Sequence, residues 1–317
     1  MNKNVKLNLD LIKNEVQKIR DLKPRIHMIP NIVTATLCAD ALSAVGARPI
    51  MAMYAEELED VIQQADGFVA NLGQPDEEKI KSVHRGIIAA NERDIPIVID
   101  PVGCCATEFR KRFVKDILRY DFTGIIKGNY AEISSILNGE SIKTGVDSQL
   151  QAEDFDKLLN NYIQKSREDI EDNDNNKDKR VYIATGETDY ILIKKTAKET
   201  GMIGTSMLDI RTSESEMIDD MQVLEMIGSE MIRSDVIGAD SKKADDKATA
   251  LTLRWNVTGT GCMYGALLGA VYAVNPKEPE KAALVTSMLM RYLLANADNT
   301  RGYATYKNSL LDTLSLV

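Results

Sequence analysis

The sequence is poor in the residues on which several classes of protein depend. It has two histidines and four cysteines with no Cys-x-x-Cys pair, so neither a zinc site nor a disulfide framework is expected. The longest uncharged run, residues 255–276, opens with a polar glycine loop, and its apolar part is shorter than the roughly 20 residues of a membrane span. The first residues lack the apolar segment of a secretion signal. We therefore predict a cytoplasmic protein with no membrane span.

Positive charge is also in short supply. Lysine and arginine total 39 against 48 aspartates and glutamates, and the net charge of −9 argues against a nucleic-acid-binding protein. It does not argue against a phosphorylated ligand, because anion sites are often built from backbone amides. With 44% hydrophobic and 27% charged residues, the composition is that of an ordinary globular protein.

The chain does contain a regular alternation of short apolar runs and amphipathic segments. This rhythm predicts an α/β fold of three layers, α/β/α, with a central, mostly parallel sheet flanked by helices. Strands are expected at 26–29, 48–53, 67–72, 95–100, 124–126 and 181–185, and helices at 10–21, 34–45, 56–64, 76–91, 109–120, 129–137, 281–295 and 309–317. Residues 190–193 are expected to pair back on 181–185 as a hairpin arm at the sheet edge.

Four side chains follow or end the predicted strands: Met51, Asn71, Asp100 and Lys127. Because ligands of parallel sheets bind beyond the carboxyl ends of the strands, these side chains are expected to share one site.

The stretch from Asn256 to Cys262 leads into a helix that is apolar nearly all round. The first turn of a helix has N–H groups without an intrahelical partner, and two glycines let the backbone approach a ligand closely. The amides of Gly259, Thr260, Gly261 and Cys262 are therefore a candidate anion hole. A thiol at a helix N-terminus tends to have a lowered pKa, which makes Cys262 a candidate reactive group; the alternative is that the glycines only cap a core helix.

We interpret residues 1–317 as a single domain with two polar insertions, near 165–180 and 196–255. The first is too polar to bury an apolar surface by itself and is expected to be a solvated loop or helix extension. In the second, methionines at near-helical spacing over 217–232 predict a core-facing helix.

Seven stretches, in this order along the chain, together resemble the hydroxyethylthiazole kinase family of the ribokinase-like superfamily. The family carries cysteine at the position of Cys262, where most ribokinase-like relatives carry aspartate. The matching stretches are residues 26–31, 49–52, 71–73, 100–103, 128–132, 185–190 and 258–262.

The resemblance implies a ribokinase-like fold and ATP- and Mg²⁺-dependent phosphorylation of the alcohol of 4-methyl-5-(2-hydroxyethyl)thiazole, a step toward thiamine. It also implies a homotrimer with active sites at subunit interfaces. Two other functions stay open: a kinase of another small alcohol such as hydroxymethylpyrimidine, and a relative that binds nucleotide without catalysis.

The resemblance also assigns roles to individual residues. Glu132, with Asp100 as a second candidate, corresponds to the Mg²⁺ site, and Lys127 and Thr185 correspond to ATP contacts. Substrate contacts are expected from Met51, Gly259 and Asn31. Cys262 is placed near the substrate hydroxyl, either as a base or as a group that shapes the pocket.

Two departures from the family pattern bear on these roles. Lys127 stands where the family usually has arginine, which keeps the charge but loses the bidentate fork. Pro30 replaces a usual threonine and removes an N–H group and a hydroxyl beside the expected substrate pocket.

Overall fold

The computed structural model describes residues 3–4, 7–138, 150–169, 179–194, 221–226, 257–298 and 300–317. Within these, one nine-stranded sheet has the order β1-β9-β8-β7-β6-β5-β4-β2-β3. Its strands are β1 (Lys3–Asn4), β2 (Arg25–Ile29), β3 (Arg48–Ile50), β4 (Gly67–Asn71), β5 (Ile97–Asp100), β6 (Gly124–Asn129), β7 (Arg180–Thr185), β8 (Asp189–Lys194) and β9 (Met221–Met226).

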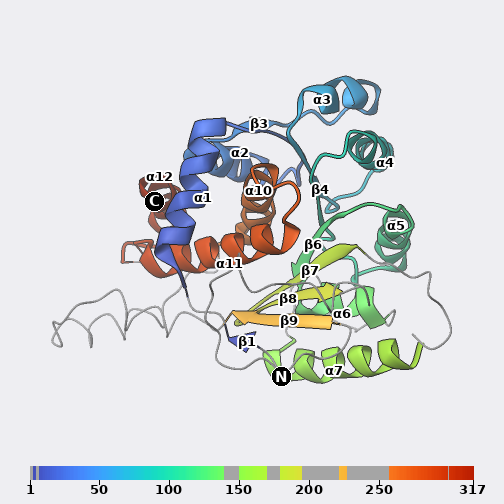
Figure 1. The fold of residues 1–317 in the computed structure, drawn as a ribbon. Coiled ribbons are helices and arrows are strands. Elements are labelled where there is room, and N and C mark those ends of the chain that lie inside the picture. The colour runs from blue at the N-terminus through green and yellow to red at the C-terminus, as the bar shows by residue number, and fades with distance from the viewer. Residues whose placement is uncertain are drawn as a thin grey trace, which may run out of the picture.

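Helices cover both faces of this sheet (Figure 1). One face carries α1 (Leu9–Leu22), α2 (Ala35–Val45), α10 (Thr260–Ala273), α11 (Pro279–Asn296) and α12 (Tyr303–Leu316). The other carries α3 (Leu58–Gln64), which follows the short helix η1 (Ala55–Glu57), then α4 (Glu77–Glu92), α5 (Glu108–Leu118), α6 (Tyr130–Asn138) and α7 (Ala152–Asp169). The predicted α/β/α layers are therefore confirmed.

The six strands from β3 to β7 run parallel, and β8 is antiparallel to both β7 and β9. The predicted hairpin of β7 and β8 is confirmed. Its expected place at the sheet edge is wrong, because β9 and β1 continue the sheet beyond β8.

Two apolar cores lie between the layers. Parallel strands that are covered on both faces have near-continuous apolar sequences, and β4 and β5 are buried along their whole length. Helix α10 is apolar all round because it fills the space between the sheet and α2 and α11, and its residues from Cys262 to Tyr272 are all buried. No described helix is long and apolar enough to cross a membrane.

One predicted element is wrong within the described residues. The methionine spacing over 217–232 predicts a helix, yet Met221–Met226 forms strand β9, which pairs antiparallel with β8 from Lys194↔Met221 to Asp189↔Met226. Pairing with an existing strand overrides a weak helical pattern, because strand preference depends strongly on tertiary context. The remainder of 217–232, and most of both predicted insertions, lie outside the described residues.

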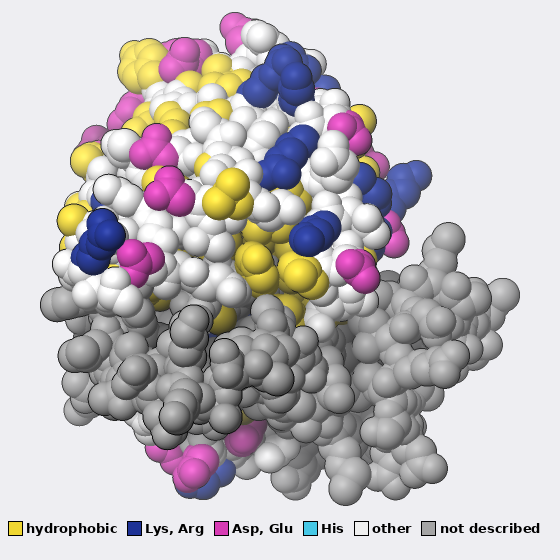
Figure 2. Space-filling view, turned by 90° about the vertical axis from the view of Figure 1, so that its left-hand side faces the viewer, with side chains coloured by type: hydrophobic (Ala, Val, Ile, Leu, Met, Phe, Trp, Pro, Cys, Tyr) yellow, Lys and Arg dark blue, Asp and Glu magenta, His cyan; other side chains and the backbone are white. Residues whose placement is uncertain are grey.

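The outer face of the helical layer with α1 and α12 is shown in Figure 2, where acidic and basic side chains are interspersed on the described part of the surface. A few large apolar side chains of the described residues are exposed, among them Leu22 of α1 (66%) and Leu316 of α12 (84%). Single exposed apolar side chains are common on folded proteins and need no partner to explain them.

Candidate active site

The predicted site residues lie along the carboxyl edge of the parallel strands. Asn71 and Asp100 are the last residues of β4 and β5 and stand opposite each other in register, and Lys127 lies near the end of β6. Met51 comes directly after β3. The prediction that these four residues fall at strand ends is therefore confirmed.

A buried ion pair forms the centre of this edge. The Nζ atom of Lys127 lies 3.6 Å from Oδ2 of Asp100, and the two side chains are 4% and 1% exposed. The same ammonium donates to the carbonyl oxygen of Gly261 (3.0 Å) and lies over the Tyr264 ring, 5.8 Å from its centroid. Lys127 thus connects the sheet to the first turn of α10.

Burial and mutual attraction act in opposite directions on this pair. Burial raises the pKa of Asp100 above its ordinary value, although Lys127 and Asn71 lower it. Burial by itself lowers the pKa of Lys127, but the nearby Asp100, Glu132 and Cys262 together outweigh burial, and the pKa of the ammonium is raised. The Oδ1 atom of Asp100 is buried and has no hydrogen-bond partner in the described part of the chain. It is a free acceptor at the centre of the site.

The glycine loop brings backbone amides to the same place. Gly259 precedes α10 in the left-handed conformation (φ 97°), which a side chain disfavours. The Thr260 amide donates to the Val257 carbonyl at 3.3 Å, so one of the four predicted amides already has an acceptor within the loop. The amides of Gly261 and Cys262 belong to the first turn of the helix, where N–H groups have no intrahelical acceptor.

The thiol of Cys262 is buried (8% exposed) and accepts a hydrogen bond from Nδ2 of Asn71 at 3.3 Å. Burial raises the pKa of the Cys262 thiol, and the neighbouring Asp100 raises it further. The position at a helix N-terminus predicts the opposite direction. The expected lowering of the pKa is therefore wrong, because desolvation and a nearby carboxylate outweigh the helix dipole.

Asn71 connects these parts and has no predicted role beyond its place at a strand end. Its Nδ2 donates to both the Cys262 sulfur and Oδ2 of Asp100 (3.0 Å), and its Oδ1 accepts from the Gly73 amide (3.0 Å). The side chain is fully buried. The sequence signal for such a residue is a polar side chain at the end of a buried strand, two positions before a glycine.

Glu132 lies in the first turn of α6, and both of its oxygens accept backbone hydrogen bonds. Oε1 accepts from the Gly103 amide at 2.7 Å and Oε2 from the Asn129 amide at 2.8 Å. Burial, together with the nearby Asp100, raises the pKa of Glu132 to about 7. A buried carboxylate whose pKa is raised by a second carboxylate marks a place where a cation is favoured. Among the described residues there is no group of three or more potential metal-binding side chains.

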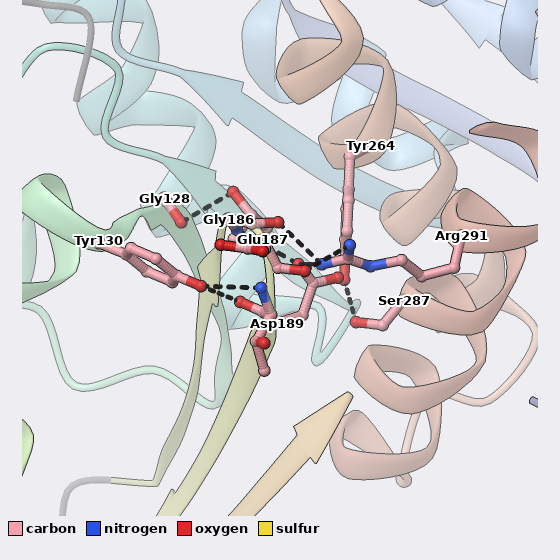
Figure 3. Close-up of polar contacts among 10 residues, drawn as sticks. Gly128, Tyr130, Gly186, Glu187, Asp189, Tyr264, Ser287 and Arg291 are labelled. Atoms are coloured by element: carbon pink, nitrogen blue, oxygen red, sulfur yellow. Dashed lines mark hydrogen bonds and ion pairs between the residues drawn. The ribbon is translucent and has the colours of Figure 1, made fainter. Parts of the chain in front are cut away.

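Thr185 ends β7, next to β6, and its hydroxyl donates to the Gly128 carbonyl at 3.2 Å. The turn that follows is fixed by two other elements (Figure 3). Arg291 of α11 donates to the carbonyls of Gly186 and Glu187 (2.8 Å each) and pairs with Asp189 at 2.6 Å. From α6, the Tyr130 hydroxyl accepts from the Thr188 amide and donates to its carbonyl. No sequence pattern predicts these hydrogen bonds or this ion pair.

Asn31 and Met51 lie at the other end of the edge. The side chain of Asn31 is next to Gly73, where an added Cβ would lie 2.7 Å from its Nδ2. Its Oδ1 accepts from the Val33 amide at 3.0 Å. Met51 is half-buried against the apolar core below α10 and is separated from β4 by β2. Asn31 thus belongs to the cluster around Asn71, while Met51 lies farther along the edge.

A helix N-terminus, a lysine and two carboxylates thus meet at the end of a parallel sheet, the place where enzymes of the α/β class bind anionic ligands. The model of the hydroxyethylthiazole kinase family matches residues 16–317. The chain belongs to the hydroxyethylthiazole kinase family.

Individual relatives agree with this assignment. A hydroxyethylthiazole kinase of Pyrococcus horikoshii is 31% identical over 302 residues, covering 95% of this chain and 89% of that protein. One of Thermoanaerobacter pseudethanolicus is 42% identical over 146 residues, which cover 45% of this chain and 55% of that protein. The chain thus matches about half the length of some curated relatives and nearly all of others.

A solved structure of hydroxyethylthiazole kinase from Pyrococcus horikoshii superimposes with a TM-score of 0.63 at 26% identity and covers 98% of this chain and 94% of that one. The ribokinase-like fold predicted from the sequence is thereby confirmed.

Proposed function

We propose that this protein transfers the γ-phosphoryl group of ATP to the alcohol of 4-methyl-5-(2-hydroxyethyl)thiazole, giving a phosphate that enters thiamine synthesis. The observation that carries the proposal is the meeting of Lys127, Asp100 and Cys262 at the first turn of α10 in a chain of this family. Phosphoryl transfer depends mainly on positioning and on neutralising charge, and these groups supply both.

The amides of Gly261 and Cys262 and the ammonium of Lys127 would face the phosphoryl oxygens. Lys127 donates to the Gly261 carbonyl, which ties the ammonium to the first turn of α10. Donors aimed at developing charge stabilise a transition state more than a ground state. Thr185, at the β7 end of the edge, would contact the nucleotide, in a turn that Arg291 holds in place.

Asp100 and Glu132 are the residues that would hold Mg²⁺. They fit such an ion because one buried oxygen of Asp100 has no hydrogen-bond partner among the described residues and because Asp100 raises the pKa of Glu132. Mg²⁺ keeps several waters and needs only one or two carboxylates. When bound, the ion would neutralise phosphate charge, and Glu132 would hold the loop at Gly103 to the end of β6 at Asn129.

The acceptor alcohol would lie between Met51, Asn31 and Gly259. A methionine suits a flat sulfur heterocycle because its thioether is polarizable and adaptable. We further propose a cytoplasmic homotrimer in which neighbouring subunits complete the active sites.

The test is to incubate the purified protein with Mg-ATP and a panel of thiazole and pyrimidine alcohols and to measure ADP. We expect turnover of the hydroxyethylthiazole. Turnover of only the pyrimidine alcohols would mean that the substrate is a pyrimidine alcohol instead of the thiazole. Turnover of none would contradict the kinase function. Sedimentation velocity on the same sample tests the trimer.

We expect Cys262→Ser to retain kcat within about threefold of wild type, because a thiol with a raised pKa is protonated at neutral pH and is a poor base. The Asn71 hydrogen bond can be made to a serine hydroxyl as well as to sulfur. The measurement is kcat at saturating ATP and alcohol, with Cys262→Asp as the comparison. A loss of two orders of magnitude in the serine variant alone would instead make Cys262 the base.

A further inference from the structure

Lys79 is a buried lysine that the proposed chemistry does not use. It lies in the first turn of α4, is 2% exposed, and its Nζ donates to the carbonyls of Pro30 (2.8 Å) and Gly73. These carbonyls are its only side-chain hydrogen-bond acceptors in the described part of the chain. A cation at the N-terminus of a helix is also disfavoured by the helix dipole. The two carbonyl hydrogen bonds are therefore what offsets the burial of this ammonium.

The Pro30 carbonyl belongs to the loop that carries Asn31, an expected substrate contact, and the Gly73 carbonyl belongs to the loop that follows Asn71. Pro30 follows β2 and precedes Asn31, and Gly73 follows β4 and contacts Asn71 through its amide. The same loops are joined again where Gln74 Oε1 accepts from the Ile32 amide at 3.2 Å. Lys79 thus connects two loops that are far apart in sequence and adjacent along the sheet edge.

The Gly73 loop is linked to the proposed reacting centre through Asn71. Asn71 Nδ2 donates to Cys262 and Asp100, so a shift of the Gly73 loop displaces both hydrogen bonds. The nucleotide end of the edge is held separately, by Thr185 on β7 and by Arg291 on α11. In the sheet, β5 and β6 lie between β4 and β7.

We propose that Lys79 is a positioning residue for the acceptor alcohol, which holds the Pro30 and Gly73 loops so that Asn31 and Asn71 keep their places around it. The inference rests on the proposed function, since the acceptor is the substrate assigned there. Burial lowers the pKa of Lys79 to about 8, while Asp76, Cys262 and Asp100 raise it. The neutral amine still has two N–H donors, so both protonation states can hold the two carbonyls.

The test is the pair of Michaelis constants in Lys79→Met, which keeps the length of the side chain and removes its donors. We expect the KM for the alcohol to rise about tenfold or more, because two hydrogen bonds from a cation are lost, with the KM for ATP within about twofold of wild type. Lys81→Met, the same change at an exposed position of α4, is expected to change neither constant. An unchanged alcohol KM, or an equal rise of both constants, would overturn the proposal.

Gln74→Ala keeps the proposal testable if Lys79→Met does not fold. Gln74 is exposed, and its loss removes the second tie between the loops. A selective rise of the alcohol KM of about two- to fivefold is expected for one neutral hydrogen bond. No change in that constant would count against the proposal.

Hydrogen exchange gives a readout that does not depend on turnover. In Lys79→Met we expect faster exchange of the amides in residues 31–34 and 72–74 than in wild type, with β7 and α11 unchanged. If the amides of both loops exchange at the same rate in Lys79→Met as in wild type, the proposed connection is overturned. Absence of turnover in the wild-type protein would instead overturn the proposed function and the acceptor role, so the two failures are distinguishable.

Discussion

Lys127→Met should lower the free energy of unfolding by about 3–5 kcal/mol, because removing one partner of a buried pair leaves the other charge uncompensated. The ammonium is the only charged group within ion-pair distance of Asp100 in the described part of the chain, and it also holds the Gly261 carbonyl. Urea denaturation of wild type and variant measures the difference. The effect is expected to be large because both side chains are almost fully buried.

Two controls separate this effect from a general cost of substitution. Lys157→Met removes the lysine of an exposed ion pair with Asp154. Its free energy of unfolding should be close to that of wild type, because exposed ion pairs contribute little to stability. Adding Asp100→Asn to Lys127→Met should recover part of the loss, since the orphaned charge is then gone. A Lys127→Met variant as stable as the Lys157→Met control would contradict the importance of the buried pair.

The sheet and the location of the site could be predicted from the sequence because both depend on local patterns. Near-continuous apolar runs such as 97–100 mark parallel strands that are covered on both faces. Since such strands end at one edge, Asn71, Asp100 and Lys127 could be expected there before their distances were known.

The chemistry of Cys262 could not be predicted in the same way. A helix N-terminus is visible in sequence, whereas the burial of the thiol and the approach of Asp100 result from how α10 packs on the sheet. Strand β9 is a similar case, because its conformation depends on pairing with β8 across a long separation in sequence.

The roles of Lys79 and Arg291 could not be predicted from the sequence for another reason. Both act mainly on backbone carbonyls, of Pro30 and Gly73 in one case and of Gly186 and Glu187 in the other. A carbonyl is present at every residue, so no residue type in the sequence marks the acceptor. Such positioning residues become visible only when the loops they join are placed in space.

Gly259→Ala should lower kcat/KM by about 10²–10³, the loss that follows removal of one oxyanion-type donor. Gly259 has a left-handed backbone (φ +97°), and an added Cβ would lie 2.7 Å from Cγ2 of Thr34. Because Thr34 precedes α2 and cannot move freely, the loop before α10 must shift instead. The amides of Gly261 and Cys262, which belong to the turn that Lys127 holds through the Gly261 carbonyl, would then be displaced.

Gly46→Ala is a matched control for the strain itself. Gly46 ends α2 with nearly the same backbone (φ +100°), and its added Cβ would lie 2.8 Å from Cγ of Arg20. It precedes β3 and so lies at the amino ends of the strands, opposite the carboxyl edge that carries the proposed site. Both variants should lose about 1–3 kcal/mol of stability, because both force a side chain into a disfavoured conformation. Only Gly259→Ala should lose activity. Activity is measured as kcat/KM, at an assay temperature well below the melting temperature of both variants. An equal kcat/KM in the two variants would mean that the loop caps a core helix and that its amides do not act on the phosphoryl group.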